Sequence, residues 1–273
     1  MIDAHVHVWD TARRALPWLP AGHPLRRDFT LADLSADRPP DLSADWPPGQ
    51  SDGRLPGLVL VQADADPAEV VDLLDLAATT PSVAGVVGWF DLRNLPADLP
   101  GDPRLVGIRS PPADQTDPDA LTDPAHVRGV GAATDAGLVI DLLLRPPALI
   151  GAARLASVVP EARLVLDHLG NPTTADATWR TGLQALAECP NVTVKLSGTA
   201  HLPPDDLAEL VDVALDLFGS DRLMFGSDWP VCTLSAGRSE VVRRTADLLP
   251  SATHNDVFRG TAQRTYRPRE TAP

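Results

Sequence analysis

Cysteine is scarce in this sequence, which has only Cys189 and Cys232 among its 273 residues, and their spacing fits no metal-binding motif. A chain of this length needs no disulfide scaffold, although one bond between the two cysteines stays open. The first residues carry neither a basic segment nor a long apolar run, so no signal peptide is expected. The longest apolar run, 137–144, is interrupted by Asp141 and is too short to cross a bilayer. We therefore expect a protein of the cytoplasm without a membrane partner.

Basic residues are outnumbered, because 23 Lys and Arg stand against 37 Asp and Glu and give a formal net charge of −14. Nucleic acids and anionic membranes select basic surfaces, so the composition argues against both as partners. A hydrophobic fraction of 44% is sufficient for a large core and excludes disorder for the body of the chain.

Two segments lack the pattern of regular secondary structure. Residues 18–55 are rich in Pro, Asp and Gly, and residues 110–124 alternate Asp with Pro. We interpret both as long loops, which in compact domains usually carry function or move. We expect residues 1–267 to form one domain and residues 268–273 to form a frayed tail.

Between these loops, short apolar runs alternate with amphipathic helical patterns such as 67–78 and 205–218. Eight such β-then-α units in one chain of this length predict an α/β fold, a single (β/α)₈ TIM barrel with long loops after strands 1 and 4. A doubly wound sheet is disfavoured because no glycine-rich phosphate turn follows the first strand. The predicted strands are 2–8, 58–62, 83–91, 105–109, 138–143, 163–168, 192–197 and 223–228.

Polar side chains close most of these predicted strands, at the end of the barrel where active sites lie. His5 and His7 are two residues apart on one strand, so both imidazoles project to the same face. A neutral imidazole can ligate a metal or donate a hydrogen bond to a carbonyl oxygen. We predict that His5, His7, His168 and Asp228 form the catalytic set, and the ligand set if a metal is bound. The alternative is a pair of histidines satisfied by polar neighbours inside the barrel.

Asp228 follows an apolar strand and a turn of small residues, where a carboxylate can take a proton from water. Its alternative role is that of a capping residue. Asp167 and His168 are adjacent, and strand alternation would turn them to opposite faces. We therefore assign His168 to the site and Asp167 to an ion pair or to a position behind the site.

Four further residues are predicted to bind substrate: Arg109, Lys195, Gln62 and Trp9. The Arg109 guanidinium suits two-point recognition of a carboxylate or hydroxyl groups, but it also suits a structural ion pair. Lys195 has the alternative role of pairing with a carboxylate, Gln62 that of tying down a loop, and Trp9 that of packing beneath one.

The segments around these residues resemble the amidohydrolase-related (amidohydrolase 2) TIM-barrel hydrolases of the group that contains L-fuconolactonase, L-rhamnonolactonase, 2-pyrone-4,6-dicarboxylate lactonase and 4-sulfomuconolactonase. The matching motifs run nearly end to end. They include residues 3–10 (DAHVHVWD), 107–109 (GIR), 165–172 (VLDHLGNP), 195–198 (KLSG) and 223–232 (LMFGSDWPVC).

The resemblance implies hydrolysis of a small lactone, of the sugar-acid or muconolactone type, with a small lactone or carboxylate as the only partner. It leaves open whether one divalent ion, zinc or manganese, is required. A binuclear site is not expected, because the fifth strand ends near Asp141 without the lysine that bridges two metals in binuclear relatives. Ser110 stands where the group commonly has histidine, and His201 matches no substrate type. Neither these residues nor any other feature of the sequence indicates the substrate or the oligomeric state.

Three other functions fit the same pattern. A metal-dependent decarboxylase would release carbon dioxide from a conjugated or aromatic acid, and an amidase would release ammonia or an amine. A barrel that only binds a small acid is disfavoured, because the strand ends carry both a base and electrophiles.

Overall fold

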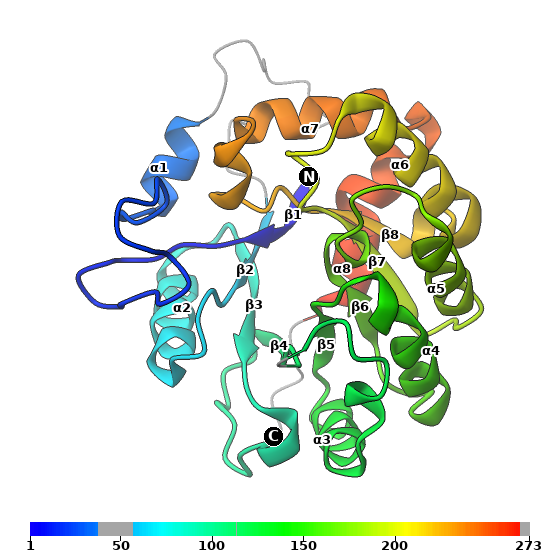
Figure 1. Cartoon of the computed structure of the whole chain (residues 1–273). Helices are drawn as coiled ribbons and strands as arrows, with labels where there is room; N and C mark the ends of the chain where they lie inside the picture. Colours follow the sequence, from blue (N-terminus) through cyan, green and yellow to red (C-terminus); the bar gives the residue numbers. More distant parts are fainter. Residues whose placement is uncertain (38–56, 113, 268–273) are drawn as a thin grey trace.

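The computed structural model describes residues 1–37, 57–112 and 114–267. Eight parallel strands follow one another in chain order, each hydrogen-bonded to the next, and helices surround them (Figure 1). The predicted (β/α)₈ barrel is confirmed. The strands are β1 (Ile2–Val6), β2 (Gly57–Val61), β3 (Val83–Trp89), β4 (Leu105–Arg109), β5 (Val139–Leu142), β6 (Leu164–Leu166), β7 (Val192–Leu196) and β8 (Leu223–Phe225).

Side chains cap the starts of four helices in the described residues, α1, α2, α3 and α5. The side chain of Asp66 accepts a hydrogen bond from the amide of Ala68, and Pro67 occupies the first helical position of α2, where it loses no hydrogen bond. The helices are α1 (Leu31–Ala36), α2 (Pro67–Thr79), α3 (Pro124–Asp135), α4 (Leu149–Val158), α5 (Ala177–Ala187), α6 (Pro204–Phe218), α7 (Arg238–Asp247) and α8 (Thr261–Thr265).

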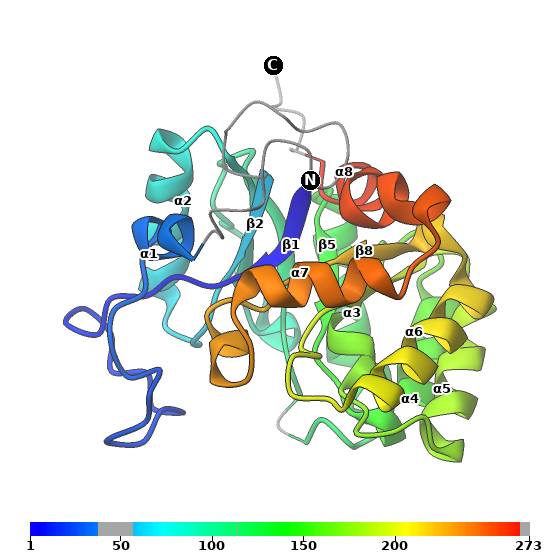
Figure 2. The same ribbon diagram turned by 90° about the horizontal axis from the view of Figure 1, so that it is seen from above.

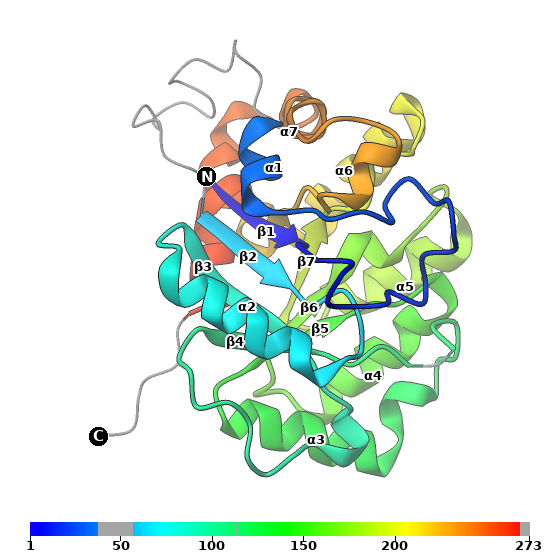
Figure 3. The same cartoon turned by 90° about the vertical axis from the view of Figure 1, so that its left-hand side faces the viewer.

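The first long loop contains a helix that the sequence pattern did not predict. Thr30 and Asp33 form a reciprocal capping box at the start of α1, which stabilises this short helix. Figure 3 shows the segment between β1 and α1 passing over the carboxyl ends of β1 and β2. Residues 38–56 of the predicted loop and the predicted tail, residues 268–273, lie outside the described residues.

Apolar side chains fill the space between the strands and the helices, and a second buried cluster rich in valine lies among the strands. Figure 2 shows the start of β1 beside α8, whose following residue Tyr266 joins this second cluster. Cys189 and Cys232 are buried and unbonded to each other. Among the described residues no helix has the length and apolarity to span a membrane. The valines of the second cluster are Val59, Val61, Val87, Val106, Val139 and Val165.

The predicted strands overrun the observed ones at their carboxyl ends, by one to three residues in seven of eight cases. The residues beyond the ends include His7, His168 and Asp228. Their backbones leave the sheet ladder there, so strand alternation no longer determines where their side chains point.

Candidate active site

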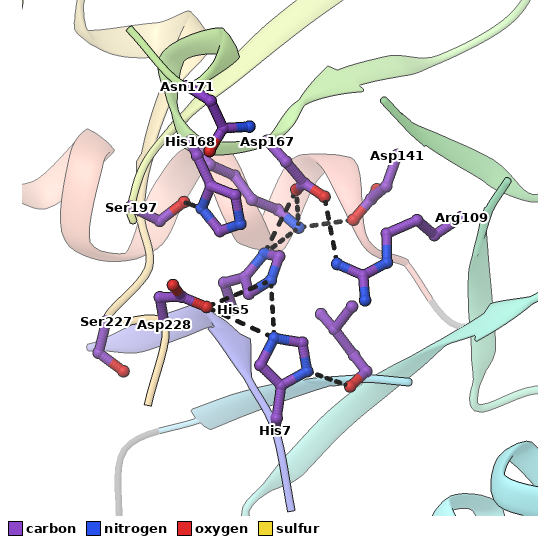
Figure 4. A network of polar contacts seen from close by, with 12 residues as sticks. His5, His7, Arg109, Asp141, Asp167, His168, Asn171, Ser197, Ser227 and Asp228 are labelled. Atoms are coloured by element: carbon purple, nitrogen blue, oxygen red, sulfur yellow. Dashed lines mark hydrogen bonds and ion pairs between the residues drawn. The ribbon is translucent and has the colours of Figure 1, made fainter. Parts of the chain in front are cut away.

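The barrel closes between β8 and β1 through the residues predicted for the site. The amide of Asp228 donates to the carbonyl oxygen of His5 at 2.9 Å, and the amide of His7 donates to that of Trp229 at 2.7 Å. These bonds bring the Asp228 carboxylate to 3.4 Å from Nε2 of His7 and 3.8 Å from Nε2 of His5 (Figure 4). Three of the four predicted catalytic residues therefore meet at the carboxyl end of the barrel.

A bulge in β1 orients the two histidines. The pairing with β2 shifts between Asp3 and Val6, so that an extra residue lies on β1. Asp3 therefore turns toward α7, where its carboxylate accepts hydrogen bonds from Nε of Arg238 and from the amide of Ser227. His5 points into the barrel, and its Nε2 lies 3.2 Å from Nε2 of His7.

The expectation that Asp167 and His168 face opposite ways is wrong. β6 ends at Leu166, and His168 adopts a left-handed conformation with φ +56°, which turns its ring back toward the site. Asp167 continues the inward face that begins with Val165 and lies 3.3 Å from Nδ1 of His5. Both side chains therefore contribute to the site, with the rings of His168 and His5 4.5 Å apart at their centroids.

Burial and charge fix the ionisation of the site. Burial lowers the pKa of His5 well below its ordinary value, and burial also lowers the pKa of His168. Burial alone would raise the pKa of Asp228, but the neighbouring imidazoles of His168 and His7 outweigh it and lower that pKa to about 2. Two neutral imidazoles and an ionised carboxylate thus coexist at neutral pH.

The residues present fit a single divalent metal ion. One ligand atom from each of His5, His7 and Asp228 lies within 4.8 Å of the others. Nδ1 of His7 is 2.6 Å from the carbonyl oxygen of Val61, which leaves its Nε2 lone pair facing the site. Two imidazoles and one carboxylate form a ligand set typical of catalytic zinc sites. His168 lies outside this group but forms a second candidate group with His5 and Asp167, and its Nδ1 is 2.9 Å from the hydroxyl oxygen of Ser197.

A charged layer lies beneath these ligands. Nζ of Lys195 lies 2.5 Å from Asp141 and 2.9 Å from Asp167, and all three side chains are fully buried. Burial disfavours the charged form of Lys195, but the two carboxylates raise its pKa above the ordinary value. Burial disfavours ionisation of Asp167, yet the ammonium holds its pKa well below the usual range. The lysine therefore remains an ammonium inside the barrel.

A cavity of about 710 Å³ opens above the ligands. Arg109 reaches it with one guanidinium nitrogen 2.6 Å from the carbonyl oxygen of Gln62 and with its plane beside the ring of Trp89. Its Nε is buried and has no hydrogen-bond partner among the described residues. The lining residues include His7, His168, Asp228, Arg109, Trp18, Trp89, Asp64, Arg145, Asn171 and His201.

Three predicted substrate-binding residues do not line this cavity. The side-chain amide of Gln62 donates to the backbone carbonyl oxygens of Asp64 and Asp66 and accepts from the backbone amide of Trp89. It therefore ties down loops. Trp9 is buried, with its indole N–H donating to a backbone carbonyl oxygen. Lys195 lies beneath His5 and the other ligands, outside the cavity. The structure gives no support to a substrate contact for any of them.

Sequence reasoning did not single out several residues that hold the site. Asp3 shares the spacing of His5 and His7, which was an available signal, but its ion pair with Arg238 depends on the bulge. Trp89, which lies in residues 85–92 of the family resemblance, and Arg145 also line the cavity. Ser110 uses its hydroxyl oxygen to accept a hydrogen bond from a backbone amide, whereas His201 lines the cavity.

The chain is similar to known proteins along almost its whole length. The amidohydrolase family (Amidohydro_2) matches residues 2–267. An L-fucono-1,5-lactonase from Burkholderia multivorans is 35% identical over 293 residues, which cover 97% of this chain and 95% of that protein.

Solved structures show the same fold. The crystal structure of an amidohydrolase from Burkholderia multivorans with bound zinc superposes with a TM-score of 0.82 at 32% identity, covering 97% of this chain and 98% of the other. A dihydroxybenzoic acid decarboxylase from Polaromonas with bound manganese has a TM-score of 0.57 at 14% identity, covering 97% and 96% of the two chains. The second likeness concerns the fold alone.

Proposed function

The chain belongs to the amidohydrolase family, as its sequence motifs predicted, and on this premise we propose that it hydrolyses a small lactone to the open hydroxy acid. The observation that carries the proposal is the meeting of the Asp228 carboxylate with the His5 and His7 imidazoles beside a cavity of about 710 Å³. The 35% identity to an L-fucono-1,5-lactonase favours a sugar-acid lactone over a muconolactone. A small-molecule substrate and the cytoplasm as location belong to the same proposal.

Asp228 is the proposed general base. Its carboxylate is ionised at neutral pH, because its pKa is lowered to about 2 despite burial. It accepts a proton from a water molecule as the water oxygen attacks the ring carbonyl carbon. When the tetrahedral intermediate collapses, the ring C–O bond breaks and the ring oxygen takes that proton back from Asp228.

His5, His7 and His168 are the proposed electrophilic groups around the carbonyl oxygen: His5 and His168 as N–H donors, and His7, whose hydrogen is on Nδ1, as a ligand of a metal ion where one is bound. Fixed N–H donors at the point where negative charge develops lower the barrier more than mobile water does. A divalent ion held by His5, His7 and Asp228 would supply Lewis-acid polarisation of the carbonyl group at the same place. Arg109, which lines the cavity, orients a hydroxyl or carboxylate of the substrate.

A pH-indicator screen of sugar-acid lactones and muconolactones, run with and without chelator, tests this function. Hydrolysis of a lactone to its hydroxy acid releases a proton at neutral pH, so turnover appears as acidification. Carbon dioxide release from aromatic acids would instead support the decarboxylase, and ammonia or amine release would support the amidase. Tight binding of a lactone without turnover would support the binding-only barrel.

Asp228→Asn and Asp64→Asn form a matched pair of variants, because both residues are aspartates that line the cavity. Only Asp228 adjoins the imidazoles. Loss of a general base is expected to lower kcat by about 10²- to 10⁴-fold in Asp228→Asn. Asp64→Asn should retain kcat within a few-fold. Equal losses in the two variants would remove Asp228 as the base.

A further inference from the structure

Lys195 is the only lysine in the sequence, and it is fully buried beneath the catalytic site. Its ammonium carries three hydrogens and meets three acceptors. Two are the carboxylates of Asp141 and Asp167, and the third is Nδ1 of His5 at 3.2 Å. Figure 4 shows His5, Asp141 and Asp167 converging from different strands on this point.

The contact between Lys195 and His5 restricts the hydrogen on the imidazole. An ammonium has no lone pair, so it can only donate, and Nδ1 of His5 must accept. A neutral imidazole that accepts at Nδ1 carries its hydrogen on Nε2. Asp167 is the competing partner, with one oxygen 3.3 Å from the same nitrogen. The contact of Asp167 with this nitrogen is an ion-pair distance without hydrogen-bond geometry, whereas the lysine contact has that geometry.

The other end of the histidine pair gives the same assignment independently. The carbonyl oxygen of Val61 can only accept, so His7 carries its hydrogen on Nδ1 and presents a lone pair at Nε2. The contact of 3.2 Å between Nε2 of His7 and Nε2 of His5 then needs a hydrogen from His5. Donation therefore runs in one direction, from Lys195 through His5 and His7 to Val61.

We propose that Lys195 is a positioning residue that holds His5 in the tautomer with hydrogen on Nε2, and thereby weakens divalent metal binding at this site. A metal ligand needs a lone pair at the nitrogen that faces the metal, here Nε2 of His5. Ligation therefore requires the hydrogen to move to Nδ1, against the ammonium and toward Asp167, with no net change in protonation. In the metal-free protein without substrate, the hydrogen on Nε2 of His5 is donated to Nε2 of His7.

The proposal rests on the proposed function only in taking His5, His7 and Asp228 as the site, and its tests do not depend on turnover. The first test is the long-range ¹⁵N–¹H NMR spectrum of ¹⁵N-histidine-labelled, metal-free wild type, with His5 assigned from the spectrum of His5→Gln. We expect Nδ1 of His5 to be unprotonated and Nε2 to be protonated, and the pattern to reverse when Zn²⁺ is added. A protonated Nδ1 of His5 in the metal-free protein would overturn the proposal.

The second test measures Zn²⁺ affinity by competition with a chelator. The double variant Asp141→Asn/Lys195→Met removes one positive and one negative charge, so the barrel keeps its net charge, and Asp167 is left to accept the Nδ1 hydrogen of His5. A carboxylate behind a metal-bound histidine changes metal affinity by about 10- to 100-fold, so the double variant should bind Zn²⁺ tighter by about that factor.

Asp141→Asn alone is the matched control, because it leaves the ammonium against His5 and should keep the wild-type Kd within a few-fold. A folded double variant with the Kd of this control would show that Lys195 is only structural. If the double variant does not fold, the tautomer measured in the wild type decides. A failed lactone screen would leave both measurements intact, so failure of the proposed function is distinguishable from failure of this proposal.

Discussion

Gly198 follows β7 with a left-handed φ of +65°, and a methyl group added to it would lie 2.7 Å from Cγ and Nδ1 of His168. Ordinary contact begins near 3.4 Å, so the ring of His168 would have to retreat by about 0.7 Å. The ring is held on its other side by His5, and its Nδ1 lies 2.9 Å from the hydroxyl oxygen of Ser197. Gly198→Ala therefore displaces His168 and breaks this contact.

Two costs of Gly198→Ala can be separated by a control. A left-handed non-glycine residue costs about 1–2 kcal/mol of stability. Gly22 has φ +81° with no atom within 4 Å of an added methyl group, so Gly22→Ala has the backbone cost alone. Both variants should lose stability to a similar degree in urea denaturation, with an additional loss in Gly198→Ala from the displaced ring.

Catalysis should distinguish the two variants more clearly. Misplacement of a reacting group by about 1 Å can cost about 100-fold in rate, so kcat/KM for lactone opening should fall by roughly that factor in Gly198→Ala. Gly22→Ala should keep the wild-type kcat/KM within a few-fold. If Gly198→Ala is folded and its kcat/KM matches that of Gly22→Ala, His168 has no role that depends on its position.

Three further changes test other parts of the site. The pKa of Asp228 is lowered to about 2 in the folded protein, so its ionised form stabilises the chelator-treated protein by about 2 kcal/mol above pH 5. About half of this stabilisation should be lost by pH 3, as the carboxylate begins to bind protons. Urea denaturation should show this pH-dependent component in wild type and not in Asp228→Asn; parallel curves would contradict it. Arg109→Lys removes the planar fork and should raise KM about tenfold with little change in kcat, and an unchanged KM would exclude a substrate contact. Arg238→Met leaves the buried carboxylate of Asp3 unpaired and should cost about 3–5 kcal/mol in thermal or urea denaturation, so a loss below about 1 kcal/mol would contradict the ion pair.

The fold could be predicted from the sequence because a barrel strand is buried on both faces and therefore appears as a short apolar run. Eight such runs, each followed by a helical pattern, left few alternatives. The carboxyl ends were less predictable, because hydropathy does not reveal where a backbone leaves the sheet. At β6 this difference turned both Asp167 and His168 toward the site, where opposite orientations were expected.

The sequence by itself determined the chemistry available at the site: two imidazoles two residues apart, a third after β6 and a carboxylate after β8. Only the tertiary structure decided how these groups act together. Their relations depend on distances of a few ångströms between segments as far apart in the sequence as Asp3 and Arg238, which are separated by 235 residues. The ammonium of Lys195 shows the difference most clearly. The sequence places it at a strand end as a candidate for binding substrate, whereas the packed barrel buries it against two carboxylates and one nitrogen of His5.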